Sequence, residues 1–103
     1  MSLSTHVLDT ARGAPAAGVP ISLTAERDGQ WTGVAEGVTD ADGRLRDWVS
    51  EVDWTPGRYR LAFHTGGPFF GDVTVEFTVT DTGRHYHVPL LLSPYGYTTY
   101  LGS

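Results

Sequence analysis

Histidine side chains give the clearest chemical signal in the sequence, and two of them lie in its densest segment. Residues 84–103 read RHYHVPLLLSPYGYTTYLGS and contain two imidazoles, four tyrosines and a run of three leucines. His85 and His87 are two positions apart, so on a strand both project from the same face. At least one of them is expected to meet solvent or a ligand. Because an imidazole changes charge near neutral pH, a titratable group beside the buried leucine run is typical of a functional site.

The same spacing also suits a metal ion. Zinc takes imidazole ligands readily, and His6 could supply a third ligand to His85 and His87. No carboxylate is spaced to complete the set, so we predict no functional metal. Arg44 follows the turn DADG, where a solvent-exposed charge is the default. The sequence shows no Ser-His-carboxylate signature that would make Ser103 a nucleophile.

Length and composition restrict the class of protein. A chain of 103 residues is expected to form a single domain over residues 1–103 with one modest core. The absence of cysteine removes disulfides and thiolate chemistry and fits a reducing compartment. A net charge of -5 and a pI near 5.1 argue against nucleic acid or an anionic membrane as partner. With no apolar leader or spanning run, we expect a soluble, cytoplasmic protein.

Alternating apolar residues predict strands throughout the chain, and no window shows the 3.6-residue period of a helix. Gly33 and Gly37 interrupt one of these runs and indicate a bulge or a close backbone approach. We predict an all-β fold, an antiparallel sandwich of seven or eight short strands with little or no helix. The expected strands include residues 4–10, 19–27, 31–39, 44–48, 58–65 and 72–80.

The leucine run at positions 90–92 makes a separate prediction. Successive side chains of a strand point to opposite faces, so Leu90, Leu91 and Leu92 cannot share one face. We therefore expect this run to be covered on both sides.

The first two thirds of the chain resemble a broad group of small sandwich modules. Residues 13–61 contain G-x-P-x-x-G-V-x-I-x-L, then T-D-A-D-G-R, then P-G-x-Y-x-L, an order similar to carboxypeptidase-regulatory and adhesin-type modules. Each element has a structural reason, such as turn geometry or a core-facing strand. These residues alone favour a structural module without chemistry.

The two ends resemble a more specific family. STHVLDTARGAPAAGVP at residues 4–20 and HYHVPLLLSPYGYTTYLGS at residues 85–103 look like the 5-hydroxyisourate hydrolases of the transthyretin-related family. The resemblance implies a transthyretin-like β-sandwich that forms a homotetramer, a dimer of dimers, with active sites between the dimers. It also implies an enzyme of purine metabolism and urate degradation that opens the cyclic amide of 5-hydroxyisourate without a metal or organic cofactor.

The resemblance carries roles onto individual residues. It places the catalytic set on His6, Arg44 and His87. His85 lies outside this set, and we interpret it as a surface or support residue. The family ends in Tyr-Arg-Gly-Ser, which here reads YLGS, so the implied substrate-binding residues are Tyr100, Leu101 and Ser103. Leucine cannot replace the planar, bidentate hydrogen bonding of the arginine. A second departure is the shortened segment between residues 63 and 73, where the family usually has a short helix and a longer loop.

Hydrolysis of a ring amide requires a base, donors for the developing oxyanion and an acid for the departing nitrogen. His6 and His87 can act as base and acid in either order, Arg44 can hold the carbonyls, and Ser103 can orient substrate or water. A diverged member that hydrolyses or cyclises another small heterocycle is the first alternative. A non-catalytic, transthyretin-like binding module is the second.

Overall fold

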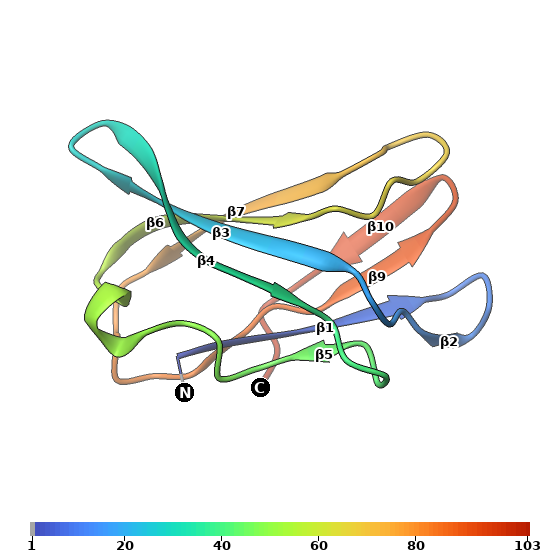
Figure 1. The fold of residues 1–103 in the computed structure, drawn as a ribbon, viewed down its shortest axis with the longest axis horizontal. Coiled ribbons are helices and arrows are strands. Elements are labelled where there is room, and N and C mark those ends of the chain that lie inside the picture. The colour runs from blue at the N-terminus through green and yellow to red at the C-terminus, as the bar shows by residue number, and fades with distance from the viewer. Residues whose placement is uncertain (1) are drawn as a thin grey trace.

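The structure, a computed structural model, describes residues 2–103 and consists of two β-sheets packed face to face (Figure 1). The described residues form ten strands, three of which have only two residues. One 3₁₀ turn at Glu51–Asp53 is the only helical element within residues 2–103. The predicted all-β sandwich is therefore confirmed, with more and shorter strands than the seven or eight expected.

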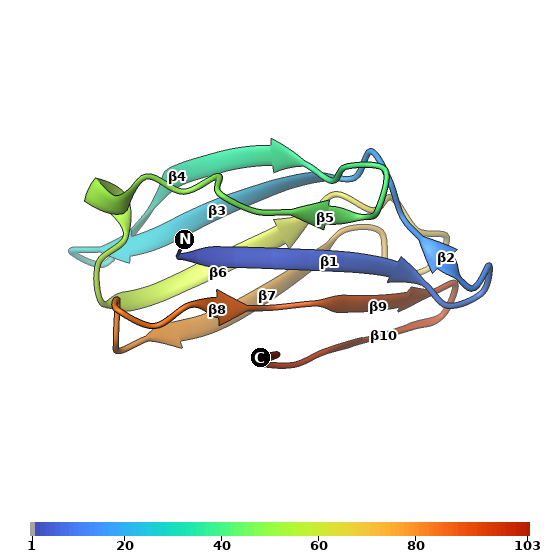
Figure 2. The ribbon, with the colours of Figure 1, turned by 90° about the horizontal axis from the view of Figure 1, so that it is seen from below.

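The first sheet is built around its N-terminal strand. β1 lies between β5 on one side and β8 and β9 on the other (Figure 2). It runs antiparallel to β2 and β5 but parallel to β8 and β9. The sequence pattern, which predicted an antiparallel sheet, did not reveal these parallel pairings. The strands are β1 (Leu3–Asp9), β2 (Ala14–Pro15), β5 (Arg44–Leu45), β8 (Tyr86–His87), β9 (Leu90–Ser93) and β10 (Gly96–Thr99).

The second sheet is antiparallel, with strand order β4-β3-β6-β7. The pairing of β3 with β4 shifts register between Leu23 and Thr24, which places the predicted bulge at Val34, beside Gly33. Gly37 marks the predicted close approach, because a Cβ there would lie 2.7 Å from the Leu45 side chain. The strands are β3 (Pro20–Arg27), β4 (Gln30–Val38), β6 (Gly57–Phe63) and β7 (Val73–Val79).

The core lies between the sheets and follows the two-residue period of the strands. Its fully buried side chains come from both layers and include Val7, Leu23, Leu61, Phe63 and Leu90. Burial of such side chains stabilises the sandwich by about 1.5–3 kcal/mol each. The outward positions of β1, β5 and β8 are thereby left for polar groups.

Two sequence expectations need correction. Within residues 2–103 the leucine run is not covered on both sides, because Leu90 is fully buried whereas Leu91 is only half-buried on the outer face. The strand expected at residues 44–48 is only Arg44–Leu45. It ends before Asp47, which has a positive φ of 56° that a regular strand does not allow.

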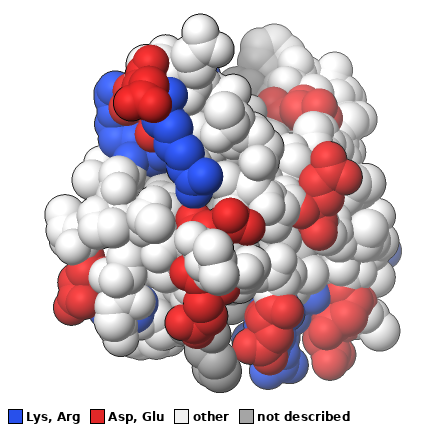
Figure 3. Space-filling model, turned by 60° about the vertical axis from the view of Figure 1, so that its left-hand side comes forward, with Lys and Arg blue, Asp and Glu red and all other residues white. Residues whose placement is uncertain are grey.

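The charged surface is mixed. On the face in Figure 3, the basic side chains at the upper left adjoin acidic ones, and further acidic side chains are spread over the face. Arg58 pairs with Glu26 at 3.0 Å, and Arg60 pairs with Glu76 at 3.2 Å. Among residues 2–103, no helix has the length and apolar character needed to cross a membrane.

Candidate active site on the outer face of the first sheet

Strand pairing places the predicted catalytic side chains on one face. Leu3, Thr5 and Val7 of β1 are buried, so the alternate positions Ser4 and His6 point outward. The register sets the Cα of His6 opposite that of Arg44 on β5 and the Cα of Ser4 opposite that of His87 on β8. Three distant segments of the sequence thus meet at adjacent outward positions.

The turn before β5 holds Arg44 in place. The Asp40 carboxylate accepts hydrogen bonds from the backbone N–H groups of Asp42 (2.8 Å) and Arg44 (3.0 Å). The Arg44 N–H contributes most to holding the pKa of Asp40 below its usual value. Gly43 has a φ of 74°, and a Cβ there would lie 2.5 Å from the Val7 carbonyl oxygen. Only glycine permits this turn to approach β1 so closely.

The C-terminal tail approaches the same face. The backbone N–H of Gly102 donates to the His87 carbonyl at 2.7 Å, and the two residues pair as an antiparallel bridge. A hollow of about 180 Å³ results, which we call the histidine hollow. Its lining residues are Ser4, Thr5, Arg44, Arg46, His85, His87 and Ser103.

A second hollow of about 360 Å³ adjoins the first, and Arg44 forms part of both walls. We call it the His6 hollow, and it is lined by His6, Leu8, Pro15, Asp42 and Arg44. The Nε2 atom of His6 lies 2.9 Å from the Asp42 carbonyl oxygen. A carbonyl can only accept, so Nε2 of His6 carries a proton, and Nδ1 is the nitrogen left for chemistry.

Electrostatics distinguish His87 from an ordinary surface histidine. Its pKa is lowered, chiefly because partial burial disfavours the charged imidazolium and then because of the positive charge of Arg44. His87 is therefore neutral at neutral pH, as a general base must be. Within residues 2–103, Arg44 and Arg46 form no ion pair, so both guanidiniums are available to carbonyl or anionic groups of a ligand.

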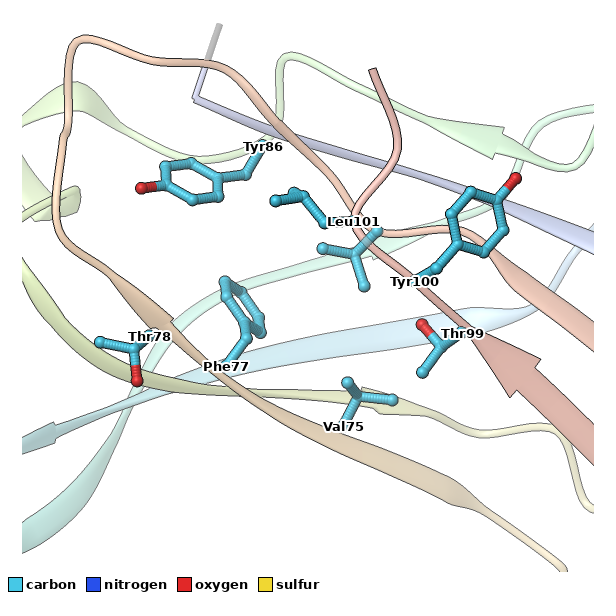
Figure 4. A pocket seen from close by; sticks show the side chains of 8 residues that line it. Val75, Phe77, Thr78, Tyr86, Thr99, Tyr100 and Leu101 are labelled. Carbon is cyan, nitrogen blue, oxygen red and sulfur yellow. The ribbon is translucent and has the colours of Figure 1, made fainter.

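Tyr100 and Leu101 lie elsewhere than the histidine hollow. They line a third, apolar cavity of about 230 Å³, which we call the edge cavity. Figure 4 shows the Leu101 side chain above Val75 and Phe77, whereas the Tyr100 ring extends away from them. Of the three residues predicted to bind substrate, only Ser103 lines the hollow that contains His87.

Three residues of the site were not predicted as functional. Ser4 and Arg46 each lie two positions from a predicted residue, so the two-residue period of a strand could have indicated both. His85 was interpreted as a surface or support residue, yet it lines the histidine hollow.

A second set of residues has the order of a catalytic triad but lies on the other sheet. Ser22 Oγ is 3.1 Å from His64 Nε2, and His64 Nδ1 is 3.1 Å from an Asp72 carboxylate oxygen. The sequence did not reveal this row. β3 is paired on both sides at Ser22, so the sheet uses the nearby N–H groups that an oxyanion hole would need. We interpret the row as cross-strand pairing that stabilises the sheet.

The fold and the site together define a small β-sandwich with an imidazole and guanidinium cluster on the outer face of one sheet. The chain belongs to the HIUase/Transthyretin family, whose family model matches residues 3–102. The resemblance seen in the sequence is therefore confirmed.

Individual relatives include 5-hydroxyisourate hydrolases and transthyretins. A 5-hydroxyisourate hydrolase of Salmonella dublin is 46% identical over 109 residues, covering 98% of this chain and 80% of the relative. One from Deinococcus radiodurans is 44% identical over 113 residues, covering 98% and 95%. The crystal structure of sea bream transthyretin in complex with thyroxine superposes with a TM-score of 0.93 at 35% identity, covering 99% and 95%.

Proposed function

We propose that this protein is a cofactor-independent hydrolase that opens the cyclic amide of 5-hydroxyisourate in urate degradation. The observation that carries the proposal is the meeting of His6, Arg44 and His87 on one outward face. Sequence identity of 44–46% to 5-hydroxyisourate hydrolases supports the same substrate.

His87 is the proposed general base. Burial and the Arg44 charge keep it neutral, so it can take a proton from the attacking water. Its Nδ1 is engaged with Ser4 at 2.8 Å, which leaves Nε2 for this step. His87 therefore activates the nucleophile.

Arg44 and His6 complete the proposed chemistry. The Arg44 guanidinium lies between the two hollows, where it can hold a substrate carbonyl and stabilise the tetrahedral oxyanion. His6 is fixed through Nε2 by the Asp42 carbonyl, so when protonated at Nδ1 it donates to the departing nitrogen. Arg46 supplies a second cation for the oxygens of the substrate.

The proposed substrate-binding residues act from the tail. Ser103 lines the histidine hollow and orients water or substrate. Tyr100 and Leu101, each 54% exposed, lie immediately before Gly102 and form the rim where the tail leaves the edge cavity. Leucine at this rim makes it apolar, which is the reason to test a diverged substrate alongside 5-hydroxyisourate.

We also propose assembly into a homotetramer, a dimer of dimers. The edge strands β7 and β10 bound the edge cavity, and each has a row of backbone groups that no other strand within residues 2–103 pairs and that a second copy can pair. Leu91, half-buried on the outer face, is suited to a second contact between dimers. Light scattering after size-exclusion chromatography gives the oligomer mass directly. The lack of cysteine fits the proposed cytoplasmic location.

The deciding experiment mixes the purified protein with freshly generated 5-hydroxyisourate and follows its ultraviolet decay against the spontaneous rate. We expect clear acceleration, lost in His87→Gln and retained in Ser22→Ala, a serine variant on the other sheet. No acceleration by a folded tetramer rejects this substrate and favours a different heterocycle. Thyroxine binding without catalysis would instead favour a carrier.

A further inference from the structure

Ser4 connects two histidines through one hydroxyl group. Its Oγ lies 2.8 Å from Nε2 of His85 and 2.8 Å from Nδ1 of His87. Both distances are those of good hydrogen bonds. Neither His85 nor Ser4 belongs to the catalytic set that the family resemblance implies.

The single proton of the Ser4 hydroxyl restricts the directions of these two hydrogen bonds. A serine hydroxyl has one proton and two lone pairs, so Ser4 can donate to only one of the two imidazoles at a time. When His87 Nδ1–H donates to Ser4, the Ser4 hydroxyl is left to donate to His85 Nε2. In that arrangement Nε2 of His87 is free of a proton, as the general base requires. In the opposite arrangement Ser4 donates to Nδ1 of His87. The His87 proton then lies on Nε2, and His87 cannot accept a proton there.

The proposed reaction leaves one proton in excess. Water adds oxygen to the amide carbon as the carbon–nitrogen bond breaks. One water proton goes to the departing nitrogen, which becomes part of a non-basic ureido group. The other belongs to the new carboxylic acid, which is ionised at neutral pH. Each turnover must therefore release one proton while substrate or product covers the histidine hollow.

We propose that Ser4 and His85 form a proton relay that connects His87 with solvent. This inference rests on the proposed function, and it assigns Ser4 a positioning role and His85 the role of exit group. His85 is exposed, whereas His87 is half-buried, so the chain of hydrogen bonds leads from the half-buried imidazole to the exposed one.

The transfer balances without a further reagent. His87 accepts a proton at Nε2 and passes the one at Nδ1 to Ser4, Ser4 passes its own to His85 Nε2, and His85 releases its Nδ1 proton to water. After product leaves, His87 loses its Nε2 proton to solvent and His85 regains a proton at Nδ1. The hydrogen bonds of Ser4 then return to their starting directions. The net result is one proton released per turnover.

Charges around His87 support this direction of transfer. Arg44 and Arg46 line the same hollow, and His6 lies on the neighbouring strand, so excess positive charge on His87 is disfavoured from several sides. His85 is exposed, so a proton that reaches it lies at the protein surface. Ser103 contributes a hydroxyl group to the lining of the histidine hollow.

The test compares Ser4→Ala with Ser4→Thr, which keeps the hydroxyl and suits a strand. We expect Ser4→Ala to lower kcat about tenfold with little change in KM. Adding imidazole buffer should restore much of its rate, while the wild-type rate stays constant. Ser4→Thr should remain near wild type. Ser22→Ala is the matched control, because it also removes a serine that contacts a histidine, at 3.1 Å, and should not change kcat.

A second readout does not depend on turnover. Nitrogen-15 NMR of labelled protein reports which nitrogen of each histidine carries the proton. We expect His87 to be protonated at Nδ1 in the wild type and to become a mixture of tautomers in Ser4→Ala.

The outcomes separate the two proposals. A wild-type protein that does not accelerate 5-hydroxyisourate decay overturns the proposed function, and the catalytic relay with it. An active wild type with unchanged kcat and no buffer rescue in Ser4→Ala overturns the relay alone. A wild-type His87 protonated at Nε2 also overturns it, whatever the activity.

Discussion

His6 and Arg44 are direct cross-strand partners on β1 and β5, and both point away from the core. They are 38 positions apart in the sequence, and the turn held by Asp40 and Gly43 returns the chain to this register. This pairing places the Arg44 guanidinium and the His6 imidazole on neighbouring strands of the same outer face. It also places Arg44 within reach of both hollows.

Replacing Arg44 should therefore impair catalysis more than stability. We expect Arg44→Ala to lower kcat/KM about 10²–10³-fold, the effect of losing an oxyanion donor. Arg44→Lys should recover only part of this, since an ammonium keeps the charge but loses the bidentate geometry. Steady-state kinetics and thermal melts give the two measurements. Arg58→Ala, an arginine on the second sheet paired with Glu26, is the control. Near-normal turnover in Arg44→Ala would contradict the assigned role.

The pKa of His87 should govern the acidic limb of the pH profile. Burial and the Arg44 charge lower this pKa below the ordinary 6.5, so the acidic limb of kcat/KM should lie at a pH below 6.5. Removing the Arg44 charge should raise the pKa of His87. An NMR titration of wild type and Arg44→Gln checks the direction. If neither the acidic limb of the rate profile nor the NMR titration of His87 moves to higher pH in Arg44→Gln, a group other than His87 sets the acidic limb.

The same lowered pKa predicts a loss of stability in mild acid. Below pH 6.5 the unfolded chain binds a proton at His87 more readily than the folded protein does, so the free energy of unfolding falls as pH falls. Asp40 and Asp72, whose pKa values are lowered from 3.8, act only at lower pH. Urea unfolding from pH 7.5 to pH 5 should show a smaller decrease in His87→Gln than in wild type. If the free energy of unfolding decreases equally with falling pH in both proteins, His87 is not the source of the acid sensitivity.

The sequence predicted the fold correctly where burial of one strand face makes apolar and polar residues alternate. Ile21, Leu23 and Ala25 alternate with polar residues in the strand expected at residues 19–27, and all three are buried. The interruption at Gly33 and Gly37 was predicted as a bulge or close approach, and both occur. The parallel pairing of β1 with β8 and β9 was not readable, because alternation fixes the face of a strand and not its partner.

The site was readable only in part, for a similar reason. The two-residue period shows that His85 and His87 share a face, but it does not show that Ser4 lies between them. The register of β1 with β8 decides that contact. The position of Leu101 beside the edge cavity depends on the bridge between Gly102 and His87, which is a long-range contact with no local signal.

Restoring a cation to the tail tests why Leu101 matters. A guanidinium cannot stay against Val75 and Phe77 without a partner, so in Leu101→Arg it should turn toward the substrate oxygens. We expect kcat/KM for 5-hydroxyisourate to rise about threefold to tenfold through charge-assisted hydrogen bonds. Leu101→Ala is the control, because it removes the apolar side chain without adding charge. A decrease in Leu101→Arg relative to Leu101→Ala would show that the substrate favours an apolar rim.

The contact between the tail and His87 gives the sharpest steric prediction. A Cβ at Gly102 would lie 2.7 Å from Cδ2 of the His87 ring and 3.4 Å from its carbonyl oxygen. The ring is held by Ser4 at Nδ1, so Gly102→Ala must displace either the imidazole or the tail. We expect at least a tenfold loss of kcat/KM with a nearly unchanged melting temperature, since small misplacements of catalytic groups are costly. Gly33→Ala is the matched control, because a Cβ there meets nothing within 4 Å. Wild-type kinetics in Gly102→Ala would mean that the tail does not set the position of the base.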